Sequence, residues 1–189
     1  CEYTRVPGIA FGAGWGWKDG TYRKRGEEVP FGDPGVNGLA GYDKPAEKGE
    51  MANPSVAYHW ESQLEHAYMI LEYQRFTGAD ILKYMPFIKS ALIFFDQHHQ
   101  LRQKMRNGKT FDENGKLVIF PSTSCESYRG AKNPSDITSG LKACLESILK
   151  LDEKYITESE KKYYAEFLNR IPDLPFGNIE GTSILKPAD

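Results

Sequence analysis

Two places in the chain carry carboxylates that could cleave a glycosidic bond. Glu126 stands in the polar run FPSTSCESYRG, residues 120–130. Glu61 and Glu65 are one helical turn apart, so both side chains can point into one cavity. Sugar hydrolysis requires such a pair, one residue as the acid and the other as the base or nucleophile. Glu61 is therefore a candidate catalytic residue, while Glu126 is a candidate because its loop is dense in side chains that can form hydrogen bonds.

Both places also have an ordinary structural explanation. The hydroxyls of a serine- and threonine-rich loop often bond to the backbone of a turn. Glutamates spaced four apart are common on solvated helix faces. The aromatic neighbours His59 and Trp60 favour a cleft at Glu61, because they stand at the expected start of a helix.

Aromatic residues make up 13% of the chain, which fits either a large core or a cleft lined by flat rings that stack on sugars. Rings and polar groups near the carboxylates are the best candidates for holding a carbohydrate. The candidate substrate-binding residues are Trp15, Trp17, His59, Trp60, Tyr128 and Arg129.

Composition argues against several other classes of protein. The formal net charge of −2 offers no basic surface for nucleic acid, and no run of about 18 apolar residues predicts a membrane span. The three cysteines are too few for a disulfide scaffold, and Cys144 fits an apolar helix face. His59 and His66 could share a helix face, but a metal site would need a third ligand that the sequence does not supply beside them. We expect no metal and no cofactor. Cys1 could be lipidated as a processed N-terminus, or the sequence could simply begin at this residue.

Periodicity predicts a mainly α chain with two αα-hairpins. Residues 1–54 are dense in glycine and proline and are expected to form an irregular loop region rather than a helix. Asn114-Gly115 predicts the turn of a small β-hairpin, and Pro86 should kink a helix or mark its start. The expected elements are helices at 58–76, 81–99, 136–150 and 158–170, paired strands at 110–112 and 117–120, and an extended piece at 182–185.

The run PSTSCESY, residues 121–128, resembles a motif of the six-hairpin glycosidases around the α-L-fucosidase and α-L-rhamnosidase branches. The stretch from Trp60 to His98 and the run NPSDI, residues 133–137, are similar to helix pairs of the same catalytic domain. The resemblance covers roughly residues 55–188. It implies an (α/α)6 toroid, Glu126 as general acid and a periplasmic or extracellular location. Cys125 and Ser127 depart from the motif, which has Pro and Asn there.

Two functions are therefore expected as alternatives. One is a glycoside hydrolase acting on plant or host glycans with paired carboxylates, and the other is a non-catalytic carbohydrate-binding or structural segment of the same fold. Because a toroid needs about twelve helices and two hairpins leave apolar faces bare, we expect the remainder of a parent domain, or a second copy, as a partner. The uncovered apolar surface is expected around Phe87, Phe94, Ile148 and Leu149.

Overall fold

The computed structural model describes residues 60–124 and 128–189, and this part of the chain is mainly helical. The four predicted helices are confirmed, with shifted ends, and two short antiparallel strand pairs accompany them. The predicted loop region 1–54 lies outside the described residues. The elements are α2 (Ser62–Thr77), the 3-10 turn η2 (Leu82–Tyr84), α3 (Met85–Asn107), β1 (Ser122–Ser124), β2 (Tyr128–Ala131), α4 (Ser135–Ile148), α5 (Glu158–Arg170), β3 (Phe176–Ile179) and β4 (Thr182–Leu185).

Local signals in the sequence set the helix ends. Gly78 ends α2 in the left-handed conformation, with φ of 68°, and its N–H donates to the Gln74 carbonyl. Pro86 stands in the first turn of α3, where a missing N–H costs nothing, so it marks the start of the helix. Thr157 and Glu160 form a capping box at the start of α5, each side chain accepting from the other's backbone N–H.

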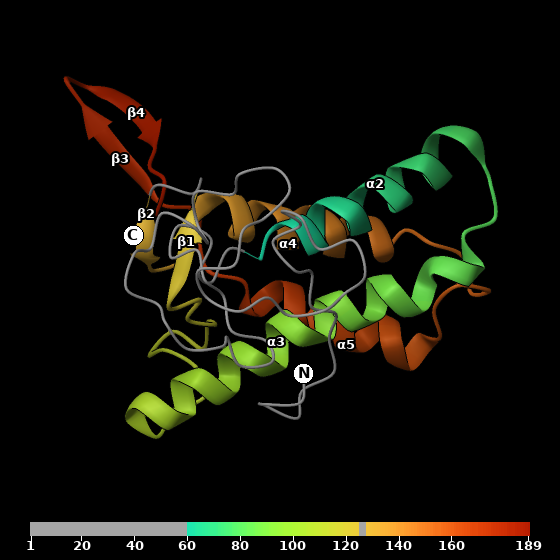
Figure 1. The fold of residues 1–189 in the computed structure, drawn as a ribbon, viewed down its shortest axis with the longest axis horizontal. Helices are drawn as coiled ribbons and strands as arrows, with labels where there is room; N and C mark the ends of the chain where they lie inside the picture. Colours follow the sequence, from blue (N-terminus) through green and yellow to red (C-terminus); the bar gives the residue numbers. More distant parts are fainter. Residues whose placement is uncertain (1–59, 125–127) are drawn as a thin grey trace, which may run out of the picture.

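The two αα-hairpins stack with equivalent helices parallel, α2 beside α4 and α3 beside α5 (Figure 1). Near the start of α2, the Leu64 carbonyl accepts from the Cys144 thiol at 3.4 Å. Lys89 of α3 pairs with Glu160 of α5 at 2.6 Å. The first turn of α2 therefore lies against the middle and second half of α4, and β1 also packs against α4.

A single hydrophobic core lies between the helices. All four helices contribute to one cluster that includes Phe95, Tyr164 and Phe167. Cys144 is fully buried within it, as its position in an apolar stripe predicted, and burial raises the pKa of its thiol to about 12. This cysteine is therefore a core residue and not a nucleophile.

Gly140 allows α2 and α4 to approach closely. A Cβ added there would lie 3.3 Å from both Cβ and Cδ1 of Leu64. We expect Gly140→Leu to lower the free energy of unfolding by about 2 kcal/mol, because the added side chain must displace Leu64. Urea denaturation measures the loss. Lys142→Leu, at an exposed position of the same helix, is the control and should change stability by no more than about 0.5 kcal/mol.

The predicted β-hairpin at 110–112 and 117–120 is wrong. The turn exists, since Gly115 N–H donates to the Asp112 carbonyl, but no strand pair flanks it. The backbone groups of Leu117 and Ile119 form hydrogen bonds with residues distant in the sequence instead. The Leu117 N–H donates to the Arg170 carbonyl, and the Ile119 N–H donates to the Asn133 side chain. Strand pairing begins only later, between β1 and β2.

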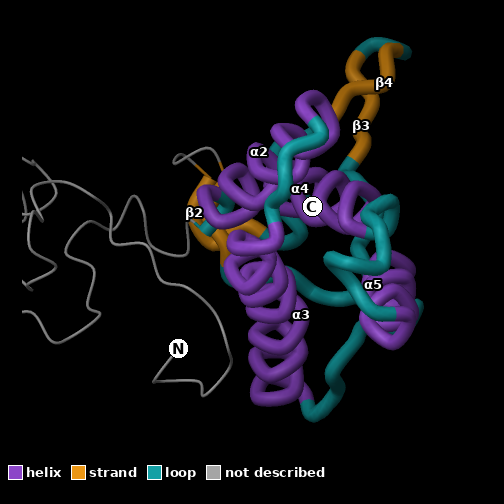
Figure 2. The backbone as a smooth tube through the Cα atoms, turned by 90° about the vertical axis from the view of Figure 1, so that its right-hand side faces the viewer, coloured by secondary structure: helices purple, strands orange, loops and turns teal. Residues whose placement is uncertain are grey.

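The second strand pair, β3 and β4, projects away from the helices (Figure 2). The predicted extended piece at 182–185 is confirmed as β4. The chain is held at the base of this hairpin, where the Lys186 N–H donates to the Pro175 carbonyl and the Ser135 N–H donates to the Pro187 carbonyl. The strands themselves contribute no residue to the buried cluster.

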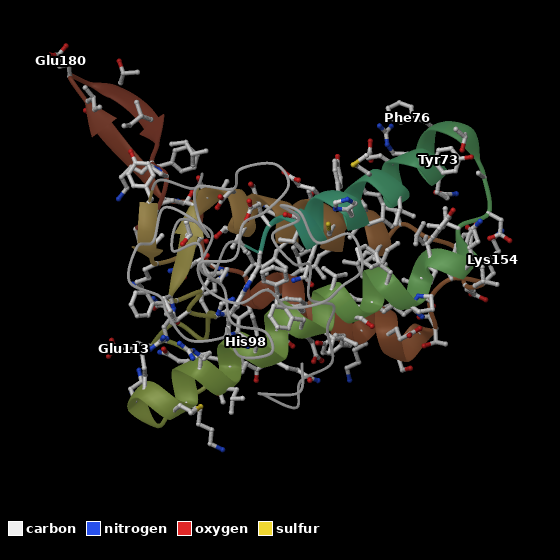
Figure 3. All side chains as sticks on the ribbon, viewed as in Figure 1. Tyr73, Phe76, His98, Glu113, Lys154 and Glu180 are labelled. Carbon is white, nitrogen blue, oxygen red and sulfur yellow. The ribbon has the colours of Figure 1, made fainter. Side chains whose placement is uncertain are left out.

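The uncovered apolar surface is not where it was expected. Phe94 and Ile148 are buried, so the predicted patch around them is wrong. One group of exposed apolar residues instead follows one face of α2, where Met69, Tyr73 and Phe76 are 66%, 54% and 74% exposed. Met105, at 75%, is a separate exposed apolar residue on α3. Tyr73 and Phe76 point outward from α2 (Figure 3). Residues spaced four and three apart share one helix face.

Candidate functional site

The candidate site lies at the end of the bundle where α2 begins. The middle of α3 passes beside Trp60, and the last turns of α3 reach the segment that leads into β1. The connection between β1 and β2 contains residues 125–127, which are outside the described residues. β1 itself is buried, because Ser122, Thr123 and Ser124 are each no more than 1% exposed.

Trp60 and two histidines of α3 form an aromatic cluster at this end. The Trp60 ring lies 4.8 Å from that of His98 and 6.1 Å from that of His99. Phe94 completes the cluster, at 5.2 Å from Trp60 and 5.0 Å from His98. Trp60 is only partly buried, so it links the core to the surface at the helix start.

The two histidines are buried and lack hydrogen-bond partners at most of their ring nitrogens. Both nitrogens of His99 and Nδ1 of His98 are unpaired. Burial, with a contribution from Arg102, lowers the pKa of His98 to about 4. Burial, aided by His98 and the two arginines Arg106 and Arg102, lowers the pKa of His99 well below its ordinary value. Both rings are therefore neutral at pH 7 and keep a donor and an acceptor nitrogen each.

Further polar atoms are buried near the start of α2. Glu61 occupies the cap position of this helix, and its Oε2 atom is shielded from solvent. The carbonyl oxygen of the Gln63 side chain is buried without a hydrogen-bond partner. Buried polar groups are usually paired, so the unpaired oxygen of Gln63 and the unpaired ring nitrogens of His98 and His99 suggest a bound water or ligand.

Asp96 of α3 belongs to a separate network in which both of its carboxylate oxygens are paired. It is 2% exposed and accepts hydrogen bonds of 2.8 Å each from Tyr163, Arg170 and Gln100. Burial and the neighbouring Asp96 raise the pKa of Tyr163 further above its ordinary value. This network joins α3 to α5 and offers no open group for chemistry.

The structure brings together some of the predicted site residues. Trp60 and Glu61 lie at the start of α2, within the cluster described above. Tyr128 stands on β2 and is 53% exposed, and the backbone of Arg129 pairs with that of Thr123. Outside the described residues lie Trp15, Trp17, His59 and the proposed acid Glu126.

Sequence reasoning missed His98 and His99 as members of the site. Both stand in an apolar helix pattern, which predicts only a core position. Their role in the site depends on the packing of Trp60, at the start of α2, against α3. No local sequence pattern reveals that contact. Glu65 is exposed, and His66 is exposed and bonds to the Ser62 carbonyl of its own helix. The one-turn pair Glu61 and Glu65 thus does not point into a shared buried cavity.

Comparisons with known proteins found no match among protein-family models, curated proteins or solved structures, so only the geometry of the site bears on its function. Within residues 60–124 and 128–189, no three His, Cys, Asp or Glu side chains gather in a way that could hold a metal ion. None of the described helices is long and apolar enough to cross a membrane.

Proposed function

We propose that the chain is a glycoside hydrolase-like protein, with Glu126 as proton donor and Glu61 as the second carboxylate. The observation that carries this proposal is the polar and aromatic cluster at the start of α2. It combines a partly exposed tryptophan, a carboxylate and two neutral imidazoles, the groups that bind sugar hydroxyls and ring faces.

The arrangement of the helices agrees with this proposal. Stacked αα-hairpins with equivalent helices parallel are the building units of an (α/α)6 toroid, which places its acid and base in loops at one end. Both β1 and the first turn of α2 pack against α4. The toroid itself, and a location in the periplasm or outside the cell, remain parts of the proposal that follow from the sequence motif.

A panel of aryl glycosides, followed by release of the aryl group, tests the hydrolase activity. We expect Glu126→Gln to lower kcat by about 100-fold, because the amide cannot protonate the leaving oxygen. Glu61→Gln should also lower kcat. The control is Glu65→Gln, one turn along α2 and exposed, which should leave kcat unchanged.

The alternative is a carbohydrate-binding segment without catalysis, which the partly exposed Trp60 also favours. Wild-type protein that binds sugars in an NMR titration but cleaves no glycoside would support this alternative. Full activity in Glu126→Gln would instead reject Glu126 as the acid. The chain would then still be a hydrolase, with another carboxylate as its acid.

A further inference from the structure

A shallow groove of about 270 Å³ lies next to the candidate site, between the end of α3 and the segment that leads into β1. Its lining combines two arginines with an aromatic ring and aliphatic groups. The lining residues are Arg102, Met105, Arg106, Phe120 and Pro121. Pro121 directly precedes β1, so the groove lies at the foot of the hairpin that carries residues 125–127.

The guanidinium of Arg106 is held in place on one side of this groove. It donates to the Phe120 carbonyl and to the Gln103 side chain, both at 2.6 Å, and it lies 4.8 Å from the centre of the Phe120 ring. These two bonds do not use all the N–H donors of a guanidinium. An arginine fixed by neutral partners is ready to bind an anion without losing much side-chain freedom.

Among the described residues, Arg106 has no ion pair with a carboxylate. Arg102 lines the same groove one helical turn away, and burial together with this like charge lowers the pKa of Arg106. An anion at Arg106 gains charge-assisted hydrogen bonds from its remaining N–H donors.

His98, Arg102 and Arg106 follow one another at four-residue spacing along α3, so they share one face of the helix. This face connects the aromatic cluster to the groove. A ligand whose ring contacts the cluster could place an acidic substituent in the groove. The Phe120 ring and the Met105 side chain contribute to the apolar part of the groove's lining.

From this geometry we infer that the groove binds the carboxylate of an acidic saccharide, with Arg106 as the principal contact and Arg102 beside it. This inference rests on the proposed carbohydrate function and names its substrate class, a sugar that carries a carboxylate. Arginine suits this role better than lysine, because its planar fork can bind both carboxylate oxygens.

NMR titration of the whole chain with D-glucuronate, D-glucose and sodium sulfate tests the inference. We expect glucuronate to bind at least tenfold more tightly than glucose, and Arg106→Gln to remove that preference. Lys104→Gln is the matched control, because it deletes the same charge from an exposed position on α3 outside the groove. It should retain the preference for glucuronate.

Three outcomes would overturn the inference. Glucose and glucuronate could bind equally, Arg106→Gln could bind glucuronate as the wild type does, or sulfate could bind as tightly as glucuronate, which would show a simple anion-binding surface. The titration detects binding without turnover. If binding of glucuronate depends on Arg106 but no glycoside is hydrolysed, the inference stands and the hydrolase proposal is rejected. If neutral glycosides are hydrolysed and the rate does not depend on Arg106, the hydrolase proposal stands and the inference is rejected.

Discussion

Asp96→Ala is expected to lower the free energy of unfolding by about 3–5 kcal/mol, because it leaves the charge of Arg170 without its buried partner. Tyr163 and Gln100 lose their acceptor in the same change. Each orphaned donor adds a desolvation cost. Urea denaturation at pH 7 measures the loss.

A surface ion pair provides the control for this prediction. Glu72 and Arg75 on α2 are also close, at 2.6 Å, but the arginine side chain is 57% exposed. Glu72→Ala should cost no more than about 1 kcal/mol, since water screens the pair. If Asp96→Ala cost as little as Glu72→Ala, the network between α3 and α5 would contribute nothing to stability.

Acidification from pH 7 to pH 4 should reduce the free energy of unfolding by about 3 kcal/mol through His98 alone. Its pKa is about 4 in the folded chain against 6.5 for the ordinary side chain. The unfolded chain therefore binds a proton at a higher pH than the folded chain does, and stability falls as the pH falls through this window. His99, whose pKa is also lowered, adds to the loss.

Between pH 6.5 and pH 5 the pH dependence of the unfolding free energy reports mainly on the histidines. Burial raises the pKa of the Glu160 carboxyl, but its bonds with Lys89 and Thr157 together lower that pKa below the ordinary value. The hydrogen bond from the Leu82 N–H lowers the pKa of Asp80. Both carboxyls therefore lose their stabilising contribution only at lower pH. His98→Gln and His99→Gln should each flatten the dependence of the unfolding free energy on pH in this interval. Gln97→Ala, at an exposed neighbouring position, should retain it. An unchanged slope in both histidine variants would show that neither ring is held neutral by burial.

The features that sequence reasoning predicted well are those decided by neighbours along the chain. The turn glycine Gly78 and the capping pair Thr157 and Glu160 act within one helical turn, so their residue types alone indicate the helix ends. The start of α3 at Pro86 follows from the same local chemistry.

The features that it missed depend on contacts distant in sequence. Leu117–Phe120 is apolar enough for a strand, but its backbone bonds to Arg170 and Asn133, which no local pattern reveals. The candidate site shows the same limit. Trp60 and Glu61 were found from their residue types, whereas His98 and His99 become part of the site only because α2 and α3 pack together.

The projecting β3–β4 hairpin gives the chain a unit that can open on its own. Its exposed residues Phe176, Ile179 and Leu185 bury little apolar area, so separating the two strands costs mainly their own hydrogen bonds. Local opening therefore requires much less free energy than unfolding of the helices. The bonds at the base, including those of Lys186 and Asp189, confine such an opening to the strands and leave the helix bundle closed.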